Sequence, residues 1–290
     1  MPIIDKQRCK IDLHIHTNVS DGTDAPESIT GLVKDAGIGL FSVTDHDAIR
    51  GCKTVKSLIK GDDPKFITGV EFSCKDEEGQ YHILGYNYDT EAKPIQDIVA
   101  KGHALRMEKL TKRLDFLKTE FGFTFANTDL MTLYAQYNPG KPHIGNLMVK
   151  YGYASTKEEA IQKYINKFHA GNAYVRPEEA IQAILGSGGI PVLAHPSYGR
   201  GDELIIGDDM DRRLGRLIGY GLQGVEAFYS GFTPKLQAEI LSFAERYDLC
   251  VTVGSDYHGE NKLVRLADTN LDSVAEYPQG LHRFLDAVLS

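Results

Sequence analysis

The order of strand-like and helix-like segments predicts an α/β fold, built on a parallel sheet or barrel and interrupted by a helical insertion. In the first and last parts of the 290-residue chain, short apolar segments alternate with amphipathic ones. This alternation is typical of β-α-β units. The middle part lacks strand-like segments, and its apolar residues have helical spacing. A third observation is that metal-binding residue types recur where the apolar segments end.

The first part of the chain holds four expected strands. Their approximate bounds are residues 10–16, 37–47, 65–74 and 80–89. Two helices are expected between the first three strands, at about 26–36 and 48–60. Pro26 suits the first turn of a helix, because its missing N–H would have no partner there. These elements predict the first half of a sheet or barrel.

Residues 92–176 form the expected helical insertion. Four leucines between residues 105 and 117 recur at spacings of three to five, which is typical of one helix face. Ser155 followed by Glu158 indicates a capping box at the start of a later helix. We expect this insertion to act as a lid or substrate domain. The remaining residues, 1–91 and 177–290, are expected to form the barrel domain.

The alternation resumes in the last part of the chain. Strands are expected at about residues 190–196, 222–230 and 249–258. Helices are expected at about 177–189, 209–219 and 233–247. The repeated pairing of a helix with a following strand favours parallel neighbours, as in open α/β sheets and barrels.

Composition restricts the classes of partner. The 32 basic and 40 acidic residues give a net charge of −8, which argues against a broad basic surface for long duplex nucleic acid. The four cysteines form no C-x-x-C pair and are expected to be reduced thiols. We find no signal-peptide core at the N-terminus and no apolar run approaching the ~20 residues that span a bilayer. A cytoplasmic protein is expected, without membrane contact; oligomeric state is not indicated.

Polar residues gather at the ends of the expected strands. His14 and His16 are two residues apart, so they share one face of a strand with Asp12. In parallel α/β folds, the carboxyl ends of the strands form the active-site face. Further residues of this kind lie at or near other strand ends: Asp45, His46, Glu71, His82, His195, Glu226, Asp256 and His258.

Histidine and carboxylate side chains together indicate a site for zinc, manganese or iron. A single such histidine is more often structural, but burying the whole set without partners would cost several kcal/mol per group. The set, with Asp21, is too large for one tetrahedral zinc ion. We therefore expect two or three divalent ions (Mn, Fe or Zn), with Glu71 as a bridging ligand. Neighbouring metal ions are suited to phosphoester hydrolysis.

Seven segments, in this order, resemble the PHP (polymerase and histidinol phosphatase) family of metal-dependent phosphoesterases. They are "DLHIHTNVSDG", "VTDHDAIRG", "GVEFS", "HILGY", "AHP", "GVEAF" and "GSDYH". The resemblance implies a distorted (β/α)7 PHP barrel with a trinuclear metal site at the strand ends. The helical insertion is most similar to that of the TrpH-like branch, which includes nucleoside 3′,5′-bisphosphate phosphatases and 5′→3′ exoribonucleases.

The resemblance also implies how the ligands are divided among the ions. The first ion would be held by His14, His16, Glu71 and Asp256. The second would be held by Glu71, His82 and His195, and the third by Asp21, His46 and His258. Asp12 and Asp45 are expected to orient imidazoles from outside the ligand set. For Glu226, an orienting role and a structural role stay equally open.

Substrate contacts are expected from basic residues of the insertion. Arg106, Lys109 and Arg113 share a helix face, and we expect the first two to bind phosphate. His143 matches a histidine of the TrpH-like insertion and is also expected to contact phosphate. Arg200, which follows "AHPSYG", is a further candidate for substrate binding. The chain has Asn172 where relatives often carry a lysine, which puts a preference for bisphosphates in doubt.

The expected function is metal-dependent hydrolysis of nucleotide phosphate esters, either a nucleoside 3′,5′-bisphosphate or the 5′ end of short RNA. The expected step is attack on phosphorus by a metal-bridged hydroxide, with water or His258 protonating the leaving oxygen. His14, His16, Glu71 and Asp256 complete the catalytic set. The alternatives are a histidinol-phosphate phosphatase, a non-catalytic metal-stabilised binding module, and an amidohydrolase acting on C–N bonds.

Overall fold

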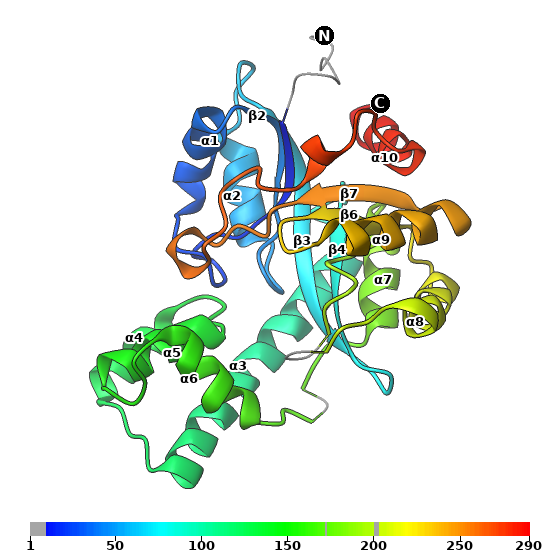
Figure 1. The fold of residues 1–290 in the computed structure, drawn as a ribbon. Helices are drawn as coiled ribbons and strands as arrows, with labels where there is room; N and C mark the ends of the chain where they lie inside the picture. The colour runs from blue at the N-terminus through cyan, green and yellow to red at the C-terminus, as the bar shows by residue number, and fades with distance from the viewer. Residues whose placement is uncertain (1–9, 172, 200–202) are drawn as a thin grey trace.

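The computed structural model of the protein describes residues 10–171, 173–199 and 203–290. In this part of the chain, seven strands form one sheet, and each strand lies beside its neighbours in sequence (Figure 1). They are β1 (Lys10–Ile15), β2 (Ile38–Val43), β3 (Lys65–Lys75), β4 (Gln80–Tyr86), β5 (Ile190–Leu193), β6 (Gly224–Tyr229) and β7 (Cys250–Gly254).

The sheet is mixed, because β4 runs antiparallel to both β3 and β5. The other adjacent strands are parallel. A short turn joins β3 to β4, with the Asp76 side chain accepting hydrogen bonds from the N–H groups of Glu78 and Gly79 at 2.9 and 3.3 Å. A connection this short can only return the chain as a hairpin. The alternation of strands and helices therefore predicted the parallel neighbours and missed this reversal.

The two ends of the sheet meet and nearly close a barrel. His16 donates its N–H to the carbonyl of Tyr257 at 2.8 Å, and Tyr257 donates to the carbonyl of His14 at 3.2 Å. These bonds join the end of β1 to the segment that follows β7. The predicted fold class, a distorted α/β barrel, is confirmed. The carboxyl ends of β1 and β7 are thereby brought together.

Helices surround this barrel, as Figure 1 shows. They are α1 (Pro26–Asp35), α2 (Arg50–Leu58), α7 (Pro177–Gly186), α8 (Gly207–Gly219), α9 (Pro234–Arg246) and α10 (Gln279–Leu289), with 3-10 turns η2 (Gly259–Asn261) and η3 (Leu271–Ser273). Proline occupies a first-turn position in α1, α7 and α9. Its fixed φ and missing N–H suit that position.

Between β4 and α7 the named elements of the described chain are all helices. The elements are α3 (Lys93–Phe121), α4 (Asn127–Ala135), α5 (Lys141–Lys150), α6 (Lys157–Lys163) and η1 (Ile165–Lys167). The cap of α6 is one residue later than the sequence predicted: Thr156 accepts the N–H of Glu159 at 3.1 Å. The division of the chain into a barrel domain and an insertion domain stays a prediction.

Helix α3 connects two hydrophobic clusters. Its first half contributes Ile95, Ile98 and Val99 to the barrel core, and its second half packs Leu110, Leu114 and Leu117 with α4–α6. Gly122 then ends the helix in the left-handed conformation, with φ of 70°, which glycine adopts without steric cost. In Figure 1, α3 accordingly runs from the barrel to the group formed by α4–α6.

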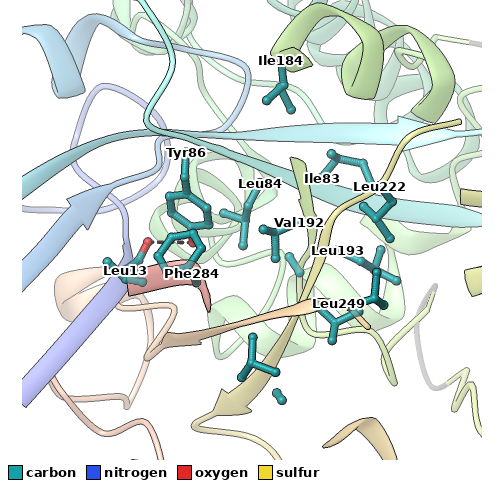
Figure 2. Close-up of a cluster of buried hydrophobic side chains, with 14 of the residues drawn as sticks. Leu13, Ile83, Leu84, Tyr86, Ile184, Val192, Leu193, Leu222, Leu249 and Phe284 are labelled. Carbon is teal, nitrogen blue, oxygen red and sulfur yellow. Dashed lines mark hydrogen bonds between the residues drawn. The ribbon is translucent and has the colours of Figure 1, made fainter. Parts of the chain in front are cut away.

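The barrel core is largely apolar (Figure 2). Tyr86 packs edge-on against Phe284 at a centroid distance of 5.4 Å. Its hydroxyl donates to the carbonyl of Leu13 at 3.0 Å, so burying this polar group leaves no unmet hydrogen bond. This bond joins β4 to β1 at Leu13, the residue immediately before His14.

Candidate metal centre

The histidine pair of β1 lies at the centre of a buried polar cluster. His14 and His16 are both fully buried, and their Nε2 atoms lie 3.1 Å apart. Because the two histidines are two residues apart on a strand, their side chains point to the same side. They lie at the edge of the sheet where β1, β3 and β7 end. Each Nε2 also lies near Glu71 Oε2, at 3.3 Å from His14 and 3.2 Å from His16.

Glu71 on β3 faces two groups of imidazoles with its two oxygens. Oε2 lies 3.0 Å from Nδ1 of His46, in addition to its contacts with the β1 pair. Oε1 lies 2.9 Å from Nδ1 of His82 and 3.2 Å from Nε2 of His195. A carboxylate whose oxygens face separate donor groups has the arrangement of a bridging ligand.

The reversed strand β4 explains how His82 reaches this cluster. The cluster forms at the carboxyl ends of the parallel strands, yet His82 lies near the start of its own strand. Because β4 is antiparallel, its first residues lie at the same edge as the last residues of β3, and Ser73 pairs directly with His82. The sequence pattern indicated His82 as a ligand but did not explain its position at the start of a strand.

Two aspartates complete the cluster on the side of β7. Oδ1 of Asp21 lies 3.4 Å from Nε2 of His258, 3.8 Å from Nδ1 of His16 and 3.9 Å from Nε2 of His46. Oδ1 of Asp256 lies 3.4 to 3.5 Å from ring nitrogens of His14, His16 and His258. All nine residues that the sequence predicted as ligands are thus brought together.

The donor atoms fit a set of divalent cations. Asp21 Oδ1, His46 Nδ1 and Glu71 Oε2 are buried without a hydrogen bond from any residue that the structure describes, which is unfavourable unless something else contacts them. Donors converge within 4.8 Å of one another in three groups. The groups are His16, Asp21, His46 and His258; His14, His16 and Asp256; and His46, Glu71 and His82.

These groups differ in part from the division of ligands that the family resemblance implied. His16 belongs to two groups, and His46 lies with Glu71 and His82 as well as with Asp21. His195 belongs to none of the three groups, but its Nε2 lies 3.2 Å from both His82 Nδ1 and Glu71 Oε1. The assignment of each residue to one ion stays a prediction.

The electrostatics of the centre favour anionic carboxylates. Burial opposes charge on Glu71, yet His46, His82 and His14 together hold its pKa well below the ordinary value. Burial likewise opposes charge on His16, but bonds to Asp256 and Glu71 raise its pKa to about 9. Since a ligating imidazole must be neutral, loading of metal is expected to release protons from the histidine pair.

Residues around the centre hold the ligands in place. Glu226 accepts from Nδ1 of His14 at 2.9 Å and from the backbone N–H of His195 at 2.8 Å. These contacts favour an orienting role for Glu226, because they fix one imidazole and the backbone of a second predicted ligand. Gly254 lies against both groups, and a methyl group at this position would overlap His14 and Glu226.

The two aspartates expected to orient imidazoles bond backbone and hydroxyl groups near the histidine pair. Asp12 accepts hydrogen bonds from the backbone and hydroxyl groups of Ser255, at 3.0 and 2.6 Å. Asp45 accepts from the N–H and the hydroxyl of Thr17 at 2.8 and 2.7 Å. Asp12 also accepts the backbone N–H of His14 at 3.3 Å, and Asp45 accepts the hydroxyl of Ser20, whose oxygen lies 3.4 Å from Nδ1 of His16. Neither carboxylate bonds an imidazole directly, and an orienting role for them stays a prediction. Residue types alone do not reveal which way a buried carboxylate turns.

The basic residues of the insertion continue the site outward along α3. Arg106, Lys109 and Arg113 are all buried. Arg106 bonds Asp47 at 3.0 Å and lies 3.7 Å from Asp21. Thus the row of cations begins beside the cluster. The ammonium of Lys109 lies 3.8 Å from the ring centroid of Tyr174.

His143 also lies at this junction. Its Nδ1 accepts the N–H of Gly140 at 3.1 Å, so a neutral His143 carries its proton on Nε2. Burial lowers the pKa of His143, against an opposing effect of Asp21. The other substrate candidate, Arg200, and the variable position Asn172 lie outside the described residues.

Comparison with known proteins gives the family. The sequence profile of the PHP domain matches residues 12–176. The chain belongs to the PHP domain family. A 5′-3′ exoribonuclease of Haemophilus influenzae is 27% identical, over 91% of this chain and 95% of that protein. A 3′,5′-nucleoside bisphosphate phosphatase of Chromobacterium violaceum is 25% identical, over 86% of this chain and 87% of that one.

Other relatives extend the range of phosphoesters. A phosphoribosyl 1,2-cyclic phosphate 1,2-diphosphodiesterase of Eggerthella lenta is 28% identical, over 86% of this chain and 94% of that protein. A solved structure from Bifidobacterium adolescentis, named as a metal-dependent phosphoesterase, is 26% identical with a TM-score of 0.79, covering 96% of both chains. An amidohydrolase structure from Chromobacterium violaceum shares the fold, with a TM-score of 0.80 at 21% identity and 97% coverage of both.

This PHP protein is therefore a metal-dependent phosphoesterase, as the sequence predicted. That result contradicts the alternative of a non-catalytic binding module. Across the described residues, no helix combines the length and apolar character needed to cross a membrane.

Proposed function

We propose that this enzyme hydrolyses phosphate esters of nucleotides, either nucleoside 3′,5′-bisphosphates or the 5′ ends of short RNA. Two or three divalent ions, manganese, iron or zinc, would be held by the nine clustered ligands. They are His14, His16, Asp21, His46, Glu71, His82, His195, Asp256 and His258. When bound, such ions activate water, neutralise phosphoryl oxygens and stabilise the leaving oxygen.

The row of buried cations on α3 is the observation that carries this proposal. No ion pair of Lys109 or Arg113 occurs among the described residues, whereas Arg106 pairs with Asp47. The Nε atoms of Arg106 and Arg113 have no hydrogen-bond partner there. A buried cation without a counter-charge, as at Lys109 and Arg113, is unfavourable unless an anion arrives. From the rise of a helix, the row extends about 10 Å from Arg106 to Arg113.

That length favours a substrate with more than one phosphate. An ester held at the metal centre would lie beside Arg106, and a second phosphate could meet Lys109 or Arg113 one to two helical turns farther out. A 3′,5′-bisphosphate and a 5′-phosphorylated RNA both have this feature. The relatives named as exoribonuclease and bisphosphate phosphatase support the same choice.

His143 is positioned to act as a hydrogen-bond donor to substrate. Its Nε2 carries the proton, because Nδ1 accepts from Gly140. By contrast, His258 has Nδ1 2.8 Å from the carbonyl oxygen of Asp256 and Nε2 3.4 Å from Asp21 Oδ1. Both of its ring nitrogens face protein atoms, so the role of a metal ligand suits His258 better than that of proton donor to the leaving group.

The test is phosphate release with manganese present, comparing adenosine 3′,5′-bisphosphate, a short 5′-phosphorylated RNA and histidinol phosphate. We expect turnover of at least one nucleotide substrate and none of histidinol phosphate. Turnover of histidinol phosphate alone would contradict the proposal and support the alternative phosphatase.

Variants of α3 connect the result to the structure. Arg113→Ala should raise KM for the bisphosphate by about tenfold, since a charged hydrogen bond is worth roughly 1.5 kcal/mol or more. It should leave KM for a substrate with a single phosphate nearly unchanged. Lys112→Ala is the matched control, because that lysine is on the same helix but its side chain is 54% exposed and paired with Glu108. Equal changes in KM for both variants would show that the row of cations on α3 does not bind the substrate.

A further inference from the structure

The two carboxylate oxygens of Asp256 have different surroundings. Oδ1 faces the ring nitrogens of the histidines at 3.4 to 3.5 Å, as described above. Oδ2 accepts the hydroxyl of Tyr229 at 3.0 Å and also contacts the ammonium of Lys262. The backbone of Asp256 is in the left-handed region, with φ of 59°, a conformation that costs about 1–3 kcal/mol for a residue other than glycine.

We propose that Lys262 is a positioning residue of the metal centre. Together with Tyr229 it holds Oδ2 of Asp256, so that only Oδ1 is presented to the ions. A carboxylate free to rotate could present both oxygens and occupy a coordination position needed by water or substrate. This inference rests on the proposed assignment of Asp256 as a metal ligand.

The charge balance of the centre supports the same role. Four carboxylates, those of Asp21, Glu71, Glu226 and Asp256, are buried close together. Arg106 lies 3.7 Å from Asp21 at the edge formed by the insertion. Lys262 contacts Asp256 from the segment after β7. Its positive charge lowers the local excess of negative charge without taking a ligand atom from the ions.

The turn that carries Lys262 is fixed to its surroundings. Asn261 donates its side-chain N–H to the carbonyl of Asp21 at 2.8 Å. Lys157 of α6 donates to the carbonyl of Asn261 at 2.6 Å. The ammonium of Lys262 therefore starts from an anchored backbone. Lys157 also provides a control, because its loss would loosen the same turn without removing any contact to Asp256.

This role of Lys262 is not indicated by sequence pattern. Lys262 is six residues beyond Asp256 in a loop, and Tyr229 ends a strand as an ordinary aromatic residue. Only the folded chain brings the phenol and the ammonium to one carboxylate oxygen. The Tyr229 hydroxyl lies 3.0 Å from Oδ2 of Asp256, so the phenol can donate to that oxygen.

The experiment measures manganese binding directly. Metal-free protein is titrated with manganese chloride, and free Mn²⁺ is quantified by its electron paramagnetic resonance signal. Loss of a group that orients a ligand typically weakens metal binding by about 10–100-fold. We expect a loss of this size for Lys262→Met, a smaller loss for Tyr229→Phe, and recovery to within about threefold of the native protein for Lys262→Arg. Far-UV circular dichroism of each variant checks that the fold is retained.

Three outcomes would overturn the inference. Unchanged manganese binding by Lys262→Met, with only KM for substrate raised, would make Lys262 a substrate contact. A loss in Lys157→Met equal to that in Lys262→Met would assign the effect to the turn as a whole. Failure of Lys262→Arg to recover binding would exclude a role for the charge. Asp256→Asn tests the assignment of Asp256 as a metal ligand separately from the role of Lys262. If this variant binds manganese normally, Asp256 is not a ligand and that assignment fails.

Discussion

Replacing Lys109 by methionine should stabilise the protein while weakening substrate binding. The side chain of Lys109 lies in the interior, and the residue is only 4% exposed. Burial lowers its pKa from 10.5 to about 7, with Asp47 opposing and Arg106 adding to the shift. This difference in the pKa of Lys109 between the folded and unfolded chains corresponds to about 5 kcal/mol of lost stability when the lysine is protonated. Methionine keeps the apolar stem and removes the charge.

The pH dependence of this effect has a definite sign. The unfolded chain binds the proton more tightly, so the cost is fully present below the folded pKa of about 7 and disappears as pH rises towards 10.5. At pH 7 we expect the free energy of unfolding of Lys109→Met to exceed that of the native protein by at least about 2 kcal/mol. This figure allows for water entering the site. The gain should shrink at about pH 10.

Urea unfolding of metal-free protein, followed by far-UV circular dichroism, measures this difference; the chain has no tryptophan to report by fluorescence. The exposed Lys112→Met is the control and should stay within about 0.5 kcal/mol of the native protein. A Lys109→Met protein that is no more stable than the native one at pH 7, or a gain independent of pH, would refute the reasoning. If Lys109→Met retained the substrate affinity of the native protein, Lys109 would not be a phosphate contact.

Three further variants test the centre. His14→Ala with His16→Ala should abolish phosphate release in a protein whose circular dichroism is unchanged; measurable activity would exclude the pair as essential ligands. Arg106→Ala should raise KM and also lower the free energy of unfolding by about 3 kcal/mol, because it leaves the buried carboxylate of Asp47 without its counter-charge; an unchanged KM would make Arg106 purely structural. Gly254→Ala should lower the free energy of unfolding by about 1–3 kcal/mol and weaken manganese binding; native behaviour in both assays would contradict the tight packing.

Local sequence was sufficient where chemistry follows from strand geometry. His14 and His16 had to share a face because they are two residues apart on a strand, and the structure shows their Nε2 atoms 3.1 Å from each other. Asp256 was found by its position just after a strand, and Glu71 by its place in the second half of one. These features need only the period of a strand and the general rule for α/β folds.

Features that depend on three-dimensional direction were not predictable. The reversal of β4 comes from a hairpin that the strand–helix alternation did not indicate. Asp12 and Asp45 resemble imidazole partners in sequence, yet they bond backbone and hydroxyl groups, while Glu226 bonds His14. Which of several nearby carboxylates meets an imidazole is decided by side-chain rotation after packing, and sequence spacing carries no information about it.

The closure of the barrel also sets an order of events during synthesis. The proposed ligands extend from His14 to His258, and the bonds between the segment after β7 and the end of β1 bring the two extremes together. A growing chain therefore has no complete donor set until His258 has been synthesised. Complete loading of the proposed centre therefore requires synthesis through His258, and a chain truncated before Asp256 could hold at most part of it.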